Sequence, residues 1–172
     1  MAVGDCDHAI QLDPAVKQAY RTRALAYVES AAFDRAVADA TAALALAPEY
    51  ADAFRVRALA HLGKQTLDQA LEDSNQAIRL APLAAECYLA RARVLMQQQS
   101  YQGALDDLSQ AIRLGPATSE LYRLRSACYE KLGDAIRAAA DSYRASELGK
   151  EAGDAASDAA SESLERKETD NQ

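Results

Sequence analysis

Residues 76–82 read QAIRLAP, and residues 110–116 read QAIRLGP. The two phrases begin 34 positions apart, and weaker copies stand at the same interval before them, AALALAP at 42–48 and HAIQLDP at 8–14. The prolines give this period independently, because all four stand 34 residues apart. A fixed period of this length is the signature of a repeat protein, in which each copy packs on its neighbours.

Each period contains two stretches of apolar residues at helical spacing. In one period, Phe54, Ala58 and Leu62 mark the first stretch, and Ala70 and Ala77 lie in the second. A short, turn-prone junction separates the two stretches. Proline closes the period because it has no N–H group to continue a helix. The pattern therefore predicts an all-α protein made of antiparallel helix pairs.

The period also sets the predicted boundaries. A half repeat at 1–16, which holds a second helix only, precedes four complete repeats at 17–50, 51–84, 85–118 and 119–152. Either the missing first helix lies upstream of Met1, or the half repeat caps the stack or pairs with another copy. After the last repeat the composition changes to Ala, Ser, Asp and Glu. For this acidic tail, 153–172, a capping helix and a disordered segment are both open.

Composition excludes several classes of protein. The chain has a net charge of −7 and therefore lacks the excess of basic residues that sequence-independent nucleic-acid binding needs. We expect no nucleic-acid partner. No apolar run approaches the roughly 20 residues that cross a bilayer, and no secretion signal opens the chain. The three cysteines stand at unrelated spacings, which argues against a disulfide framework. We therefore expect a cytoplasmic protein without a membrane partner.

Columns of equivalent residues indicate which helical repeat this is. Three equivalent positions in each first helix carry an aromatic residue, a small residue and a second residue that is aromatic in most repeats. In chain order they are Tyr20, Ala24 and Tyr27, then Phe54, Ala58 and His61, then Tyr88, Ala92 and Leu95, and finally Tyr122, Ser126 and Tyr129. The second helices carry two alanine columns: Ala36, Ala70, Ala104 and Ala138, and Ala9, Ala43, Ala77, Ala111 and Ala145. With the closing prolines, this pattern resembles tetratricopeptide repeats over nearly the whole chain, to about residue 148. The resemblance implies a right-handed α-solenoid of antiparallel helix pairs, whose concave groove holds a peptide or helix of a partner protein.

The junctions and the first helices depart from the family pattern. The helix-joining glycine of the family is present only as Gly63, shifted by two positions, and Gly133. Thr66 followed by Gln69 predicts a capping box at the start of one second helix. A leucine common in the first helix of the family is arginine in each complete repeat: Arg23, Arg57, Arg91 and Arg125.

These arginines run parallel to an unbroken column of aspartates, Asp5, Asp39, Asp73, Asp107 and Asp141. A catalytic site is a single arrangement of residues, whereas this pattern recurs in every complete repeat. We therefore interpret the two columns as a recurring contact between packed helices. Whether Asp39 meets Arg23 in its own repeat or Arg57 in the next is open at this stage.

A second set of arginines lies on the face of the first helices that lines the groove in the family. With apolar neighbours it makes the predicted partner-binding groove: Arg21, Leu25, Val28, Arg55, Val56, Leu59, Leu89, Arg93, Met96 and Arg123. Asp52 and Glu120 stand three residues before Arg55 and Arg123, so a self-paired, solvated surface is one interpretation. The other is a positive and apolar groove that receives an acidic or amphipathic helix.

One subset of the family grips a C-terminal carboxylate with paired asparagines. Leu25 and Val56 stand at those positions here, so we do not transfer that activity.

The candidates for chemistry are few. Cys6 and His8 lack a second pair of ligands for zinc, and His61 occupies an aromatic place of the repeat, where a packed ring is expected. No glycine-rich phosphate loop follows a strand pattern. We therefore predict no catalytic, cofactor-binding or metal-binding residues, no cofactor, and no enzyme.

The sequence thus predicts a non-catalytic interaction module or scaffold that binds a protein or peptide in its groove. The alternative is a targeting or regulatory segment of a larger protein or enzyme complex, with the half repeat at 1–16 as a sign of N-terminal truncation. Because the apolar face of this half repeat lacks a neighbour, we also expect weak self-association through residues 1–16.

Overall fold

The computed structural model describes residues 2–151, and within that range it contains helices and no strand. In chain order these are α1 (Ala2–Leu12), α2 (Lys17–Glu29), α3 (Phe33–Leu46), α4 (Ala51–Gly63), α5 (Leu67–Leu80), α6 (Ala85–Gln97), α7 (Tyr101–Leu114) and α8 (Ser119–Lys131), followed by helical residues 135–151. The predicted all-α solenoid of antiparallel helix pairs is confirmed. The acidic tail, 153–172, lies outside the described residues.

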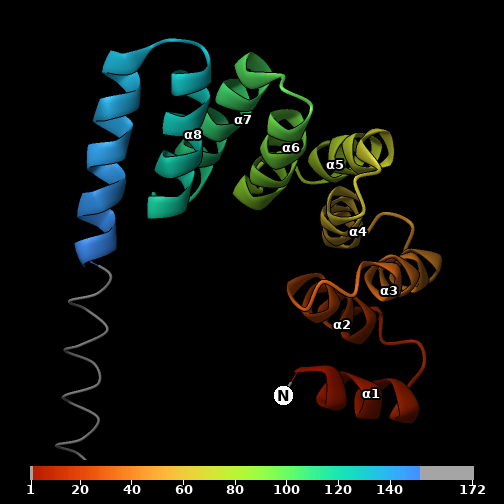
Figure 1. The fold of residues 1–172 in the computed structure, drawn as a ribbon. Helices are drawn as coiled ribbons and strands as arrows, with labels where there is room; N and C mark the ends of the chain where they lie inside the picture. Colours follow the sequence, from red (N-terminus) through yellow and green to blue (C-terminus); the bar gives the residue numbers. More distant parts are fainter. Residues whose placement is uncertain (1, 152–172) are drawn as a thin grey trace, which may run out of the picture. The chain divides into compact units, whose positions relative to one another are not determined.

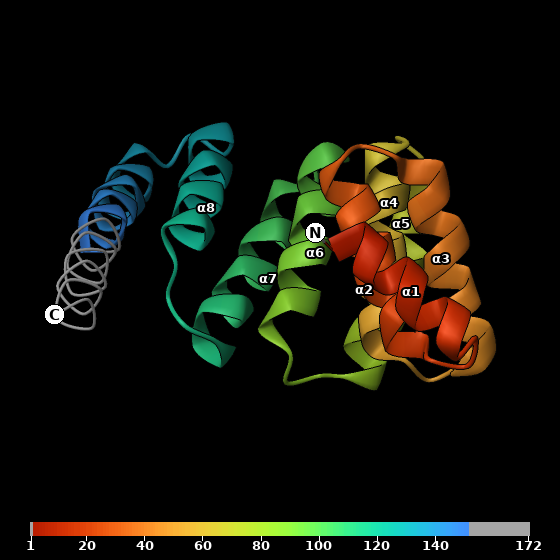
Figure 2. The same cartoon turned by 90° about the horizontal axis from the view of Figure 1, so that it is seen from below.

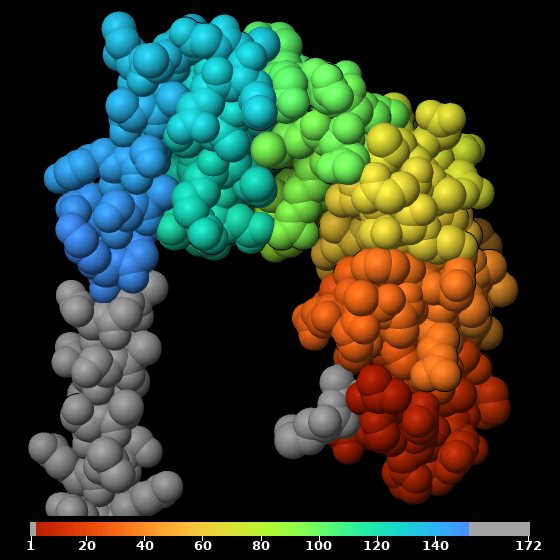
Figure 3. Space-filling view, viewed as in Figure 1, coloured from red at the N-terminus to blue at the C-terminus, as the bar shows by residue number. Residues whose placement is uncertain are grey.

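The chain divides into an N-terminal unit, 1–115, and a C-terminal unit, 116–172. In the N-terminal unit each helix packs against the next along the chain, from α1 to α7, and α2 also contacts α4, which contacts α6. Figure 1 shows α2, α4 and α6 along the inner side of this row and α3, α5 and α7 along its outer side. We call these two sets the inner and the outer helices. Figure 2 turns the same row so that α1 lies in front, and Figure 3 shows its surface in the same order.

The described part of the C-terminal unit is a helix pair of the same kind. α8 packs against the helix at 135–151, since Ser126 Oγ donates a hydrogen bond of 2.8 Å to the carbonyl of Ala138. Arg125 Nε lies 2.7 Å from Asp141 Oδ2 across the same pair. This Arg–Asp contact recurs in the helix pairs of the N-terminal unit, as described below.

The alanine columns lie where helix axes come closest. Ala24, Ala58 and Ala92 are fully buried, as are Ala70 and Ala77. A longer side chain at these positions would push the helices apart. Ala9 is only partly buried, and α2 is the helix against which α1 mainly packs. The small-residue pattern therefore reports the close approach of neighbouring helices.

The turn between the two helices of a pair has one residue in the left-handed region of the backbone. In the C-terminal unit this residue is Gly133, with φ of 80°. Non-glycine residues stand at the same place in the other three pairs: Ala31, Gln65 and Gln99, with φ of 56°, 61° and 61°. Gly63 is therefore not a shifted helix-joining glycine. It ends α4 and leaves room for Phe33, whose ring atoms would lie 2.3–2.6 Å from an added Cβ.

The predicted capping box at Thr66 is absent. Thr66 is the N-cap of α5, but its side chain accepts no hydrogen bond from the first turn of that helix. The hydroxyl instead donates to the carbonyl oxygen of His61, at 3.1 Å. His61 thus ties the end of α4 to the start of α5, which the capping pattern does not reveal.

Candidate functional site

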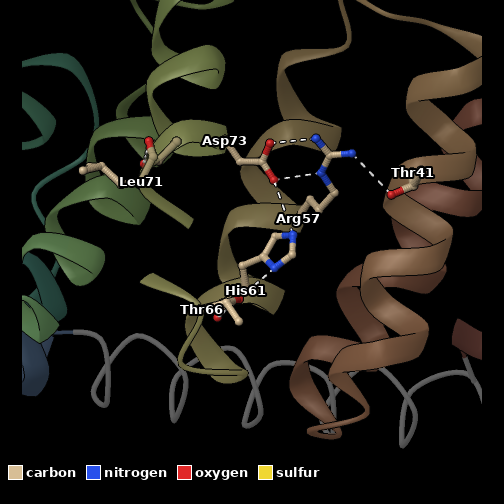
Figure 4. A network of polar contacts seen from close by, with 7 residues as sticks. Thr41, Arg57, His61, Thr66, Leu71 and Asp73 are labelled. Carbon is tan, nitrogen blue, oxygen red and sulfur yellow. Dashed lines mark hydrogen bonds and ion pairs between the residues drawn. The ribbon is translucent and has the colours of Figure 1, made fainter. Parts of the chain in front are cut away.

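The recurring arginines pair with the aspartates of their own repeat. Arg57 on α4 donates from Nε and Nη2 to the two carboxylate oxygens of Asp73 on α5, at 2.8 and 2.7 Å (Figure 4). The other pairs have the same two-bond geometry and the same separation of 16 residues: Arg23 with Asp39, Arg91 with Asp107, and Arg125 with Asp141. The carboxylates are buried, and their hydrogen bonds raise the pKa of each arginine above its usual range. This ladder joins the two helices of each pair.

In the N-terminal unit the third nitrogen of the guanidinium reaches back to the helix that precedes it along the chain. Arg57 Nη1 donates to Thr41 Oγ1 at 3.3 Å. Arg23 and Arg91 make the corresponding contacts with Asp7 and Asn75, at 2.6 and 2.8 Å. Each of these arginines therefore links two successive repeats. Its repeated geometry supports a structural role in the stack.

The apolar residues of the predicted groove separate into two groups. Val56 is fully buried and forms a core cluster with Ala24 and Ala40, against which Leu25 and Val28 pack. Because no part of Val56 is accessible, the prediction that it lines the groove is wrong. Leu59, Leu89 and Met96 are partly buried and keep some exposed surface. The helical periodicity marked apolar positions, but it did not distinguish core from groove.

Two of the groove arginines share one carboxylate. Arg21 Nε on α2 lies 2.8 Å from Asp52 Oδ2, and Arg55 Nε on α4 donates to Asp52 Oδ1 at 2.7 Å. Arg21 also donates to the hydroxyl of Tyr50 at 3.3 Å, and the ammonium of Lys17 lies 5.0 Å from the centre of that ring. We call Lys17, Arg21, Tyr50, Asp52 and Arg55 the basic cluster. Its side chains bridge the two inner helices α2 and α4.

The spacing rule found only part of this cluster. The pairing of Asp52 with Arg55, three residues apart on one helix, is confirmed. The contacts of Arg21 and Lys17 join residues on different helices or on a connecting segment, so no local spacing reveals them. Arg93 is partly buried on α6, and Arg123 is exposed on α8 in the C-terminal unit. Within the N-terminal unit, the structure therefore brings together Arg21 and Arg55.

A cavity of about 340 Å³ adjoins the basic cluster. It lies among the start of α4, the α5–α6 connection and the start of α6, and its lining includes Asp52, Arg55, Glu86 and Cys87. Cys87 is buried, and burial raises the pKa of its thiol above the usual 9.0. The same holds for Cys6 and Cys128, so these buried thiols are poor nucleophiles at neutral pH. The cavity therefore offers a polar rim and no activated group.

A larger cavity, of about 550 Å³, lies between α3, α4 and α5. Its lining includes Arg57 and Asp73 of the ladder, together with His61. The Nδ1 atom of His61 lies 2.9 Å from Thr66 Oγ1, and its Nε2 lies 4.0 Å from Asp73 Oδ2 (Figure 4). Burial lowers the pKa of His61 below its usual 6.5, so the ring is neutral at pH 7. Sequence reasoning did not predict this cavity, because three separate helices form it.

Within residues 2–151, no group of three or more His, Cys, Asp and Glu side chains has the arrangement of a metal site. None of the helices in that range has both the length and the apolar character of a membrane span.

Comparison with known proteins gives one consistent result. A family model described as tetratricopeptide repeat matches residues 21–86 and 89–166. A thermophilic repeat protein of Thermus thermophilus, TTC0263, is 23% identical with a TM-score of 0.77, over 91% of this chain and 86% of that one. MamA, from residue 41 to its end, of Desulfovibrio magneticus RS-1 is 16% identical with a TM-score of 0.70, over 85% and 82%.

A tetratricopeptide repeat protein of Parabacteroides merdae ATCC 43184 is 21% identical with a TM-score of 0.72. The match covers 86% of this chain and 57% of that protein. No curated protein matches the chain in sequence. At these low identities, the likeness to solved structures establishes the fold alone.

Proposed function

Because the chain belongs to the tetratricopeptide repeat family, we propose that it is a non-catalytic module that holds a peptide or helix of a partner protein along the inner helices α2, α4 and α6. The family and its fold are those of a protein–protein interaction module. The groove, the chemistry of the partner and the role as a scaffold are our proposal. They are supported by the side chains that the inner helices present.

The basic cluster carries this proposal. Arg21 and Arg55 share the single carboxylate of Asp52, and Lys17 adds a third positive charge beside Tyr50. The arginine side chains are 28% and 16% exposed, so both remain accessible from solvent. Within the cluster one carboxylate faces three cations, and Glu86 lines the adjoining cavity, so an excess of positive charge remains. The cluster is therefore suited to receive a carboxylate of a partner, because two guanidinium groups are already held in place for it.

Apolar surface lies on the same inner helices. Leu59 on α4 and Leu89 and Met96 on α6 are partly buried and retain exposed area. An amphipathic helix binds a groove through apolar anchors at helical spacing, and its polar face then makes contacts at the rim. A partner helix with acidic residues beside its apolar face would match both features. We therefore propose an acidic, amphipathic segment as the ligand.

The test compares charge reversal on the inner helices with the same change on the outer helices. Tagged wild-type protein, the variant Arg21→Glu with Arg55→Glu, and the control variant Arg35→Glu with Arg113→Glu are used to capture partners. Arg35 and Arg113 are exposed on the outer helices α3 and α7, so the control has the same net charge. We expect the inner variant alone to lose its partners, and higher salt to weaken the wild-type interaction.

Circular dichroism and thermal melting first show that the variants remain folded. The proposal is wrong if the inner variant and the wild type retain identical partners. It is also wrong if the control loses the same partners, because binding would then follow overall charge rather than the inner helices.

We also propose weak self-association through residues 1–16. Leu12 at the end of α1 is 74% exposed. Light scattering over a range of concentrations should show the mass rising, and Leu12→Lys should suppress the rise. A constant monomer mass for the wild type would refute this proposal.

A further inference from the structure

The cavity between α3, α4 and α5 is distinct from the proposed groove. Phe54, Arg57 and His61 line it from α4, at the spacing of one helical face. Asp52, Arg55 and Leu59 lie on another face of the same helix, which points to the groove. Its volume of about 550 Å³ falls within the range of roughly 300–1,000 Å³ of known ligand sites. A second site on α4 is therefore geometrically available.

The donors at the floor of this cavity are already occupied. Arg57 directs Nε and Nη2 to Asp73 and Nη1 to Thr41. Arg57 therefore offers no free nitrogen to a ligand in this cavity. The hydroxyl of Thr66 contacts both the carbonyl oxygen and the Nδ1 atom of His61.

Gln76 supplies an acceptor in the same cavity. Its Oε1 atom is buried and has no hydrogen-bond partner among the described residues, and Gln76 lines the cavity wall. A buried amide oxygen without a partner is costly, so natural proteins rarely leave one unsatisfied. A water molecule or a ligand with an N–H or O–H group would satisfy it.

The equivalent glutamine on α7 shows which group can satisfy the amide oxygen of Gln76. Gln110 stands in the same QAIRL phrase, and its Oε1 accepts a hydrogen bond from the guanidinium of Arg113. In α5 the corresponding Arg79 makes no such bond, although it also lines the cavity. The glutamine amide oxygen thus accepts a hydrogen bond from a guanidinium on α7, whereas the equivalent oxygen on α5 has no such donor.

The charge of the lining agrees with this chemistry. Three carboxylates, Glu49, Glu72 and Asp73, face two guanidinium groups, and one of these, Arg57, is held by Asp73. The neutral imidazole of His61 adds no positive charge. Glu49 and Glu72 are exposed at the rim, where they can meet a cation that enters. The site therefore offers acceptors and excess negative charge.

We propose that the cavity between α3, α4 and α5 binds the guanidinium group of an arginine side chain on a partner protein. This inference rests on the proposed function as a protein-binding module, but it concerns a different surface and a ligand of opposite charge. A guanidinium has five N–H donors in one plane, which suits a buried amide oxygen in a cavity with carboxylates at its rim.

The experiment is an NMR titration of the isotope-labelled full chain with Nα-acetyl-arginine methylamide. The neutral isostere Nα-acetyl-citrulline methylamide is titrated in parallel. We expect saturable shifts of the Gln76 side-chain amide and the His61 ring, with a Kd in the millimolar range for so small a probe. The Gln110 amide should not shift, and the citrulline probe should bind at least tenfold more weakly.

Matched variants locate the effect. Gln76→Met should weaken arginine binding about tenfold or more, because it removes the open acceptor, whereas Gln110→Met should leave the Kd unchanged. Neither variant touches Arg21 or Arg55, so capture through the groove should persist in both. Failure of the arginine probe to bind while groove capture stays intact would therefore overturn this inference alone.

Three results would overturn the inference. The first is the absence of a saturable shift, which would mean that the cavity holds only water. The second is binding of the arginine probe to Arg79→Met protein but not to the wild type, which would mean that Arg79 itself closes the site. The third is failure of the peptide Gly-Ser-Arg-Ser-Gly to bind when the blocked amino acid does, since the ligand would then be a small molecule.

Discussion

The outer helices α5 and α7 contain the same five residues, QAIRL, yet their glutamines have different surroundings. Gln110 on α7 accepts a hydrogen bond from Arg113, whereas Gln76 on α5 is buried without a partner beside a cavity. Identical local sequence therefore does not give an identical site. The residues that decide the difference lie on other elements.

The neighbouring elements differ at two places. His61 and Gln69 line the cavity beside α5, and the corresponding residues one repeat later are Leu95 and Gly103. Leu95 packs so closely on Gly103 that an added Cβ there would lie 3.3 Å from Leu95 Cδ1. An apolar contact thus stands where the earlier pair has an imidazole and an amide. The ladder is common to both, so the repeats share a frame and differ in what surrounds it.

The largest expected effect tests the shared frame. Asp73→Asn and Asp107→Asn each replace a buried carboxylate that accepts two hydrogen bonds from an arginine. Each should lower the free energy of unfolding by about 2–4 kcal/mol, because the guanidinium loses its charged partner. Urea denaturation measures both. A difference above about 1 kcal/mol between them would show that the surroundings of the two pairs affect the cost, since His61 and Thr41 stand where the later repeat has Leu95 and Asn75. No loss in either variant would refute the structural role of the ladder.

The next effect tests the close approach of the helices. Ala77 and Ala111 follow the two glutamines directly and are fully buried. Ala77→Leu and Ala111→Leu should each cost about 1–3 kcal/mol by overpacking. Thermal melting measures the loss, and Gln102→Leu, at an exposed position of α7, serves as the control with little change. A neutral Ala77→Leu with a costly Ala111→Leu would mean that the cavity beside α5 absorbs the added side chain.

A smaller effect is expected at the turns of the two pairs. Gln65 and Gln99 both have φ of 61°, a conformation that suits glycine. Gln99→Gly should raise the free energy of unfolding by about 0.5–1 kcal/mol, since relief of strain exceeds the entropy cost of glycine. Gln65→Gly should gain less, because the Gln65 side chain donates to Leu62 O and accepts from Gln97. Chemical denaturation of the two variants would contradict this ranking if Gln65→Gly gained more.

The smallest expected effect is a pH dependence of stability that comes from His61, whose counterpart one repeat later, Leu95, does not titrate. Burial lowers the pKa of His61, against the opposing charge of Asp73 and with help from Arg57 and Lys64. The unfolded chain therefore takes up a proton more readily than the folded one, and wild-type stability falls as pH drops below about 6.5. His61→Leu should lose less stability than the wild type over the same range. Urea titrations at several pH values measure the free energy of unfolding of both proteins. Equal losses of stability in the wild type and in His61→Leu would mean that the pKa of His61 is not lowered by folding.

The architecture was predictable because it depends on periodic signals. The prolines, the alanine columns and the paired Arg and Asp columns recur at a fixed interval, so each copy strengthens the interpretation of the others. Local signals within a single repeat were less dependable. Thr66 suggested a capping box, but its hydroxyl bonds with His61 instead, and Gly63 proved to be a packing position against Phe33.

One contact of the basic cluster was predictable from local spacing, and the burial of a neighbouring apolar residue was not. Asp52 and Arg55 lie three residues apart on α4, and a spacing rule found their contact. Val56 is adjacent in sequence and fully buried, since a step of one residue turns the side chain to another face of the helix. The addition of Arg21 and Lys17 to the cluster required the contact between α2 and α4.

The sequence by itself determined a stack of helix pairs in the tetratricopeptide repeat family, because helical periodicity and small residues at close contacts are written locally and repeated. The tertiary structure alone decided which arginine meets which aspartate, which carboxylate two guanidinium groups share, and where Gln76 is left without a partner. These depend on side chains brought together from separate helices. Two identical phrases of sequence can therefore fold into the same helix and still border different sites.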